Sequence, residues 1–204
     1  MEAREGIELV GHADWPAGRK LLAAVTKLDP AWATTWSGRY RVPAIEVHLL
    51  NNVGPAVRAQ GYLDRKELLE VIEWKAGHRT LGRADRGNTD WQIEEITRAA
   101  LNAPEGIQHR ILTLLDYVGV RTASAILAIV FPDRETVMDI RALGALKRFT
   151  QLGEIITPLD AYCDPHLPPY IQYRDLCVSL RPMTECSLRD VDRALWAWHE
   201  AGMP

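Results

Sequence analysis

The stretch LLDYVGVRTASAIL (residues 114–127) has the character of a helix end, a tight bend and the beginning of a second helix. Gly119 offers the backbone freedom that a tight bend needs, and it leaves no side chain above the N-terminus of the second helix. Ala123 and Ala125 are small enough to let two helices cross closely. We therefore expect a helical hairpin over 115–122, whose free backbone amides favour an anion such as a phosphate.

The rest of the chain repeats its apolar residues at helical spacing, and no stretch alternates as a strand does, so the fold class is all-α. Asp64 is a favoured helix N-cap, and Thr89 with Gln92 has the spacing of a capping box before an apolar-periodic run that ends at Pro104. Beyond these two helices, over 64–76 and 89–103, the pattern predicts helices near 17–28, 43–50, 105–116, 120–130, 140–149, 168–180 and 187–201.

The composition describes a folded protein without a general affinity for nucleic acid. The chain has 204 residues, 47% of them hydrophobic, a formal net charge of −3 and an isoelectric point near 6.1. A length of this order can bury a sizeable core. Any binding to nucleic acid must come from a local basic patch, because the net charge of the molecule is negative.

The N-terminus has no signal-peptide pattern, and the longest apolar run, AILAIVF, is too short to span a bilayer. We expect a cytoplasmic monomer that does not associate with membranes.

The number and spacing of the three cysteines do not predict a metal site or a cofactor. Their number is odd for a disulfide framework and too small for a cluster held by four thiolates. Cys163 and His166, in the sequence CDPH, could form a zinc site with Cys177 and Cys186. However, Tyr173, Cys177 and Leu180 recur at helical spacing, which favours Cys177 as a small hydrophobic residue on a buried helix face.

The hairpin segment and the sequence FPDRETVMDIRALGAL after it resemble the helix-hairpin-helix DNA glycosylase (HhH-GPD) superfamily. That family has a Leu-x-Gly-Val-Gly hairpin, a lysine or its substitute, Thr-Ala, and an aspartate at the start of a later helix. Arg121 occupies the place of the lysine, and Asp139 follows it by 18 residues, as in the family pattern. Two positions depart from the pattern, since Tyr117 replaces the usual first glycine and Asp116 a common proline. The resemblance covers 105–149 clearly and 62–104 loosely.

The resemblance implies a two-lobed fold in one unit, 1–204. Its central lobe would span 62–150, and 1–61 with 151–204 would form the second lobe, with the Pro-rich segment 163–169 as a hinge or chain return. It also implies that the hairpin contacts double-stranded DNA through Tyr117, Val118, Gly119, Arg121 and Thr122.

Asp139 is the expected catalytic residue. Cleavage of an N-glycosidic bond develops positive charge on the deoxyribose, and a nearby carboxylate stabilises that charge. A helix N-terminus would keep Asp139 ionised. The alternative role is an ordinary N-cap for helix 140–149, and the two roles are compatible.

Arg121 in place of lysine predicts the reaction type. Bifunctional glycosylases attack the sugar with a deprotonated amine, whereas a guanidinium stays protonated and is a poor nucleophile. We therefore expect a monofunctional enzyme that hydrolyses the bond to a damaged or modified base and leaves an abasic site.

The segment EWKAGHRTLGRADRGNTDW is locally basic and follows an apolar helix. A glycosylase extrudes its target base and stacks it against aromatic side chains. The expected DNA contacts in this segment are Lys75 and Arg79. The expected walls of the base pocket are Trp74, Trp36 and Tyr40. Trp196 and Trp198 are expected to be packing residues of a terminal helix.

Three other functions are consistent with the same residues. The chain could be a non-catalytic helix-hairpin-helix DNA-binding protein in which Asp139 is only a cap. It could be a glycosylase with lyase activity that uses Lys75 or Lys147 as the amine, or a helical adaptor for other proteins. The base is open among alkylated purines, deaminated or mismatched pyrimidines, oxidised guanine and hypermodified bases.

Overall fold

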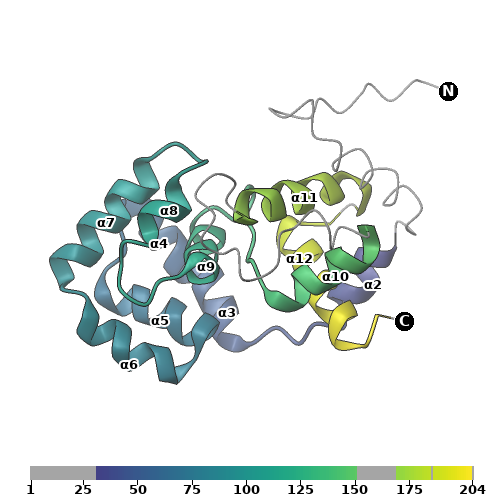
Figure 1. Cartoon of the computed structure of the whole chain (residues 1–204), viewed down its shortest axis with the longest axis horizontal. Helices are drawn as coiled ribbons and strands as arrows, with labels where there is room; N and C mark the ends of the chain where they lie inside the picture. Colours follow the sequence, from purple (N-terminus) through teal and green to yellow (C-terminus); the bar gives the residue numbers. More distant parts are fainter. Residues whose placement is uncertain (1–30, 151–168, 185, 204) are drawn as a thin grey trace.

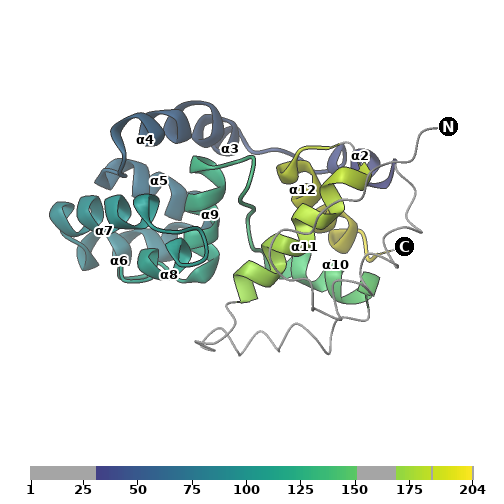
Figure 2. The same cartoon turned by 90° about the horizontal axis from the view of Figure 1, so that it is seen from above.

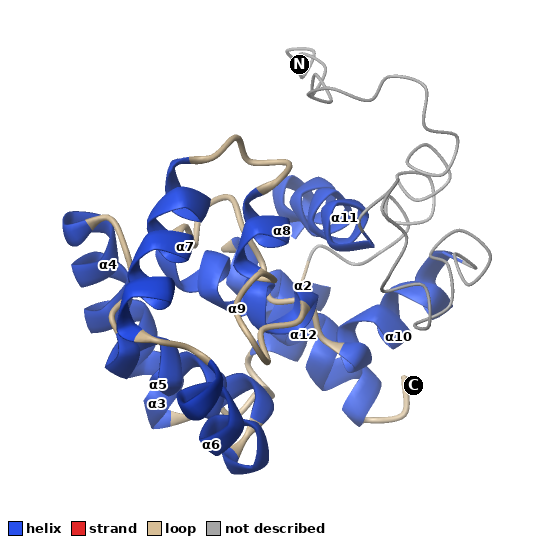
Figure 3. Cartoon of the chain, turned by 60° about the vertical axis from the view of Figure 1, so that its left-hand side comes forward, coloured by secondary structure: helices blue, strands red, loops and turns tan. Residues whose placement is uncertain are grey.

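The computed structural model describes residues 31–150, 169–184 and 186–203, and in these ranges every regular element is helical, as Figure 3 shows. The all-α prediction is confirmed. No helix in these ranges is long and apolar enough to cross a membrane. The elements are α2 (Trp32–Ser37), α3 (Ala44–His48), the π-helical turn η1 (Leu49–Val53), α4 (Gly54–Gln60), α5 (Arg65–Ala76), α6 (His78–Gly87), α7 (Asp90–Asn102), α8 (Gln108–Leu112), α9 (Val120–Val130), α10 (Ile140–Thr150), α11 (Pro169–Thr184) and α12 (Leu188–Glu200).

Helices whose first residues carry capping signals begin where the sequence predicts. The amide of Glu67 donates to the Asp64 carboxylate at 2.8 Å, and the Glu67 carboxylate accepts from the Asp64 amide at 2.8 Å, which closes a capping box on α5. Thr89 and Gln92 form the same motif on α7. Helix α9 spans the predicted 120–130. The expected helix 17–28 lies outside the described residues.

Helix α6 is an element that the sequence analysis does not expect. Its cap, Gly77, lies at φ +74°, a left-handed conformation that glycine adopts readily and that lets the chain turn directly from α5 into α6. Leu81 and Ala84 then pack toward the core, and Ala84 is fully buried. These two residues lie on the side of α6 that packs against the rest of the group, with α5 as its main neighbour.

Helix α8 is shorter than the predicted 105–116. It ends at Leu112, and the amides of Leu114 and Leu115 donate to carbonyls three residues earlier, in tight turns that lead into the bend. The expected helix 43–50 divides into α3 and η1 and continues as α4 to Gln60.

The helices form two groups, which Figures 1 and 2 show from two sides. One group contains α3 to α9, and the other contains α2, α10, α11 and α12. Segments 38–43 and 131–139 connect them. Residues 44–60 pack with α5 and α9 in the first group, and α10 packs with α12 in the second, so the chain passes from one group to the other along 38–43 and 131–139.

Each group has its own buried residues. Leu68, Ile72, Ile93 and Ile126 are completely buried in the first group. In the second, the predicted buried face of α11 is confirmed, since Tyr173, Cys177 and Leu180 are all inaccessible to solvent or nearly so. Cys163 and His166 lie outside the described residues.

Candidate active-site pocket

Asp139 lies at the start of α10, at the end of the segment that connects the two groups. Its Oδ1 accepts from the amide of Arg141 at 2.9 Å, and its carbonyl accepts from the amide of Leu143 at 2.9 Å. Asp139 is therefore an N-cap of α10, which fixes its side chain against the helix. About a fifth of that side chain, 22%, is exposed, so the carboxylate is accessible.

Lys75 points at this carboxylate. Its Nζ lies 2.9 Å from Asp139 Oδ2, and only 10% of its side chain is exposed. Burial raises the pKa of Asp139, but the Lys75 charge and hydrogen bond, with the Arg141 amide, outweigh burial and hold that pKa below its ordinary value. The carboxylate is therefore ionised at neutral pH. In this structure the Lys75 side chain therefore pairs with Asp139 at the pocket, and its expected contact with DNA stays a prediction.

A pocket of about 180 Å³ surrounds this ion pair. It is smaller than the pockets of drug-sized ligands, which begin near about 300 Å³, so it suits a single small ring. The expected residues Trp74 and Tyr40 line it together with Lys75 and Asp139. The other lining residues are Pro43, Val137, Arg189, Asp192 and Trp196.

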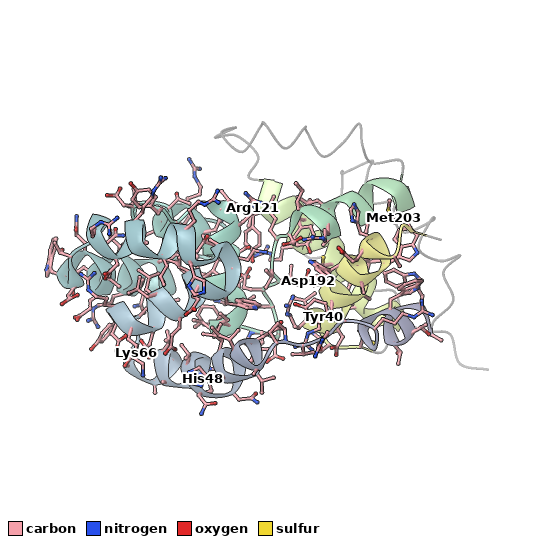
Figure 4. The ribbon with its side chains drawn as sticks, turned by 90° about the horizontal axis from the view of Figure 1, so that it is seen from below. Tyr40, His48, Lys66, Arg121, Asp192 and Met203 are labelled. Carbon is pink, nitrogen blue, oxygen red and sulfur yellow. The ribbon has the colours of Figure 1, made fainter. Side chains whose placement is uncertain are left out.

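One face of α12 completes the pocket. Arg189, Asp192 and Trp196 occur at i, i+3 and i+7, so they share a side of the helix. Figure 4 labels Asp192 and Tyr40 where the second group meets the first. This face is not predicted from the sequence, where Trp196 is expected only as a packing residue. The helical spacing of the three residues is the signal that could have revealed it.

The charges of α12 are paired within the protein. Arg189 contacts the Asp192 carboxylate, and Asp192 also accepts from the Tyr173 hydroxyl at 2.8 Å. Burial raises the pKa of Asp192, and the guanidinium of Arg189 opposes that effect without cancelling it. The residue is 1% exposed, so Asp192 holds Arg189 in place rather than meeting a ligand with an open carboxylate.

Glu46 lies behind the pocket and is completely buried. Burial raises its pKa, but Arg189 and Arg193 outweigh burial and lower that pKa below its ordinary value. Its Oε2 accepts from the Tyr40 hydroxyl at 3.1 Å. Burial, together with the charge of Glu46, raises the pKa of Tyr40 to about 12. The hydroxyl of Tyr40 therefore stays protonated and its ring stays oriented at the pocket wall.

Ser124 joins the hairpin to Asp139. Its hydroxyl donates to the carbonyl of Arg121 at 2.7 Å and accepts from the amide of Met138 at 2.9 Å. The side chain is completely buried, so the interaction fixes the residue before Asp139 against the first turn of α9. The spacing between Arg121 and Asp139 thus has a structural counterpart, which sequence reasoning did not connect to Ser124.

The backbone of the hairpin differs from the expectation at Gly119. Gly119 has an extended conformation, φ −82° and ψ 174°, and a Cβ there would meet no atom of the described residues within 4 Å. The left-handed residue is Tyr117, at φ 66°, which is the position where the family pattern has glycine. The strain of the bend therefore falls on Tyr117, and Gly119 leaves only open space above α9.

The hairpin residues divide by exposure. Gly119 and Arg121 are exposed at the start of α9, which no side chain caps, and Tyr117 is half exposed. Val118 and Thr122 are buried, so neither side chain is exposed to solvent. Figure 4 labels Arg121.

Asn88 attaches the hairpin to the end of α6. Its Oδ1 accepts from the amide of Asp116 at 2.8 Å, and its Nδ2 donates to the Asp116 carbonyl at 3.0 Å. Asn88 is 6% exposed. Gly87 also lies against the hairpin, since a Cβ at that position would be 2.9 Å from the Asp116 Cβ. The end of α6 and the bend before α9 therefore form one local structure.

The basic face of α6 consists of Arg79, Arg83 and Arg86. They occur at i, i+4 and i+7, and all three are exposed. Within the described ranges no carboxylate forms an ion pair with them, whereas Arg65 on α5 is paired with Asp85. The expected residue Arg79 is thus one of three arginines available on one helix face.

Trp36 does not line the pocket. It lies on the buried side of α2, which packs on α12, and the guanidinium of Arg39 is 4.3 Å from its ring. A larger hollow, of about 440 Å³, lies between α5 and α6, and it contains no residue that the sequence analysis singled out. Its lining residues are Arg65, Lys66, Leu69, Glu70, Glu73 and Leu81. Among the described residues no three potential ligands are grouped for a metal ion.

In comparisons with known proteins, no protein-family model, no curated protein and no solved structure matched this chain.

Proposed function

We propose that this protein is a monofunctional DNA glycosylase. The observation that carries the proposal is an ionised, accessible aspartate, Asp139, in a pocket with the aromatic rings of Tyr40 and Trp74. The pocket is attached through Ser124 to a hairpin whose helix N-terminus is open to an anion. An extruded base would stack on the rings, and a DNA phosphate would bind at the hairpin.

In the proposed reaction, the bond between the sugar carbon and the base nitrogen breaks, and its electron pair leaves with the base. The departing base takes up a proton. Asp139 stabilises the cationic sugar, and the oxygen of a water molecule bonds to the same carbon. That water gives its proton to Asp139 or to solvent. The products are a free base and an abasic site.

The monofunctional assignment rests on Arg121 and on the state of Lys75. Arg121 stays protonated and is a poor nucleophile. Lys75 is close enough to the pocket to favour the lyase alternative. However, its ammonium is ion-paired with Asp139 at 2.9 Å, and a paired ammonium has no free electron pair to attack the sugar.

The basic face of α6 supports DNA as the partner. Arg79, Arg83 and Arg86 form a local cationic surface on a chain of net charge −3, and Arg86 precedes the residues that hold the hairpin. A non-catalytic DNA-binding protein would use the same surface and hairpin. It would have no need of an accessible carboxylate in a pocket, so catalysis is the better-supported function.

Incubation with a panel of duplexes, each with one modified base, tests the proposal. Alkaline cleavage after turnover should reveal an abasic site in at least one duplex. Borohydride added during turnover should trap no protein–DNA adduct. Efficient trapping that disappears in Lys75→Met would replace the monofunctional assignment with the lyase, and binding without base release would favour the non-catalytic protein.

A further inference from the structure

We infer that the pocket selects an uncharged base that carries a carbonyl group, and that it rejects cationic alkylated purines. This inference rests on the proposed glycosylase function and names its substrate class. Two observations support it. Cations of the protein already lie against the aromatic rings and carboxylates of the pocket, and Lys75 has hydrogen-bond donors left for a ligand.

The aromatic rings of the pocket already face cations of the protein. The guanidinium of Arg189 lies 5.5 Å from the ring of Trp74 and 5.7 Å from that of Tyr40. The guanidinium of Arg141 lies 4.9 Å from the ring of Trp196. A cationic ligand is attracted to aromatic faces within about 6 Å. A cationic base entering here would meet rings that are already engaged, with a like charge beside them.

The carboxylates around the pocket are also paired. Asp139 pairs with Lys75, Asp192 with Arg189, and the buried Glu46 with both Arg189 and Arg193. A cationic base would therefore have to displace an existing cation before it gained a carboxylate. A neutral base stacks on the rings without that cost, because stacking needs no net charge.

Lys75 provides the hydrogen-bond donor for such a base. An ammonium group has three donors and no acceptor, and Asp139 uses one of them. The Lys75 ammonium has no second hydrogen-bond partner among the described residues, and Lys75 lines the pocket, so its other donors can meet a base there. A carbonyl oxygen accepts from such a donor, and a base that leaves with extra electron density on that oxygen accepts more strongly. In this inference Lys75 donates a hydrogen bond to the carbonyl of the base, and Asp139 stabilises the cationic sugar.

The test compares duplexes of one sequence whose central base is uracil, hypoxanthine, 8-oxoguanine, 7-methylguanine or 3-methyladenine. The last two are cationic as nucleosides, and they leave DNA readily without an enzyme. Each rate is therefore divided by the rate for the same duplex without protein. We expect a rate enhancement at least about ten-fold larger, on the scale of one desolvated cation–π contact, for one of the three neutral bases than for either cationic base.

A larger enhancement for a cationic base would overturn the inference and leave the proposed function intact. No release from any duplex would count against the proposed function itself, and the inference would fail with it.

Two variants at one position test the donor. Lys75→Gln keeps a hydrogen-bond donor without the charge, and Lys75→Met removes both. Both variants lose the ion pair with Asp139, so that loss cancels in the comparison. For the preferred neutral base we expect kcat/KM to be about 2- to 10-fold higher in Lys75→Gln than in Lys75→Met, the range of one hydrogen bond. Equal values would overturn the role of Lys75 in recognising the base.

Discussion

The imidazole of His109 is buried next to Tyr170, with ring centroids 5.3 Å apart. Neither ring nitrogen has a hydrogen-bond partner among the described residues. Burial, with smaller contributions from Arg110 and Arg174, lowers the pKa of His109 from its ordinary 6.5 to about 4. Between pH 6.5 and 4, His109 therefore binds a proton in the unfolded chain but not in the folded one. The free energy of unfolding must fall as the pH falls through this range.

His109→Leu should remove that dependence. The parent should lose up to about 3 kcal/mol of unfolding free energy between pH 7 and pH 4 through His109, and the variant should lose correspondingly less. At pH 7 the variant should be within about 1 kcal/mol of the parent or more stable, because no hydrogen bond of the ring is lost. Urea unfolding of both proteins at several pH values measures the difference. Parallel pH profiles would contradict the assignment.

At the bend, the stability of the fold should depend more on Tyr117, which has the left-handed φ, than on the glycine at 119. Tyr117→Gly should stabilise the fold by up to about 1 kcal/mol, because a left-handed φ costs an L-residue about that much. Gly119→Ala should change stability by less than about 1 kcal/mol, since its backbone is extended and its surroundings are open.

Thermal unfolding measures both effects, and filter binding to an unmodified duplex gives the functional consequence. Gly119→Ala should weaken binding to every duplex, since its methyl group would stand where a phosphate approaches α9. A large loss of stability in Gly119→Ala, or binding equal to that of the parent, would show that the bend works differently.

At the scale of elements, the sequence best predicts those helix boundaries that are set by hydrogen bonds between neighbouring residues. Asp64 and Thr89 cap their helices through their own neighbours, so α5 and α7 begin as predicted. Helix α6 depends on a turn at Gly77 and on the surface of α5, neither of which appears in its own periodicity. The inward direction of Lys75 likewise depends on Asp139, which is 64 positions away, and the face of α12 becomes a pocket wall only because α5 lies opposite.

The arginines of α6 should act as an element on DNA binding. Each substitution Arg79→Ala, Arg83→Ala or Arg86→Ala should weaken binding to all duplexes alike, and should reduce the slope of log affinity against log salt by about one. Lys66→Ala is a matched control, because it removes one exposed positive charge from α5. Fluorescence anisotropy at four salt concentrations gives the slopes. Equal slopes in all variants and the parent would exclude this face as the DNA surface.

At the scale of the whole molecule, the pocket exists because two groups of helices meet. Trp74 and Lys75 come from the end of α5 in the first group, and Arg189 and Trp196 come from α12 in the second. The Asp139 connection lies between them. The net charge of −3 describes neither the basic face of α6 nor the balanced charges of the pocket, so DNA affinity must depend on the local surface and fall steeply with salt.

The most direct test of the account is base release by Asp139→Asn under single-turnover conditions, on the duplex that the parent cleaves best. The asparagine can still accept from the Arg141 amide and cap α10, but it has no charge to stabilise the sugar cation. We predict a rate at least about 100-fold lower, with DNA affinity within about three-fold of the parent. Base release at the parental rate by a folded Asp139→Asn would contradict the account, because Asp139 would then be a helix cap and nothing more.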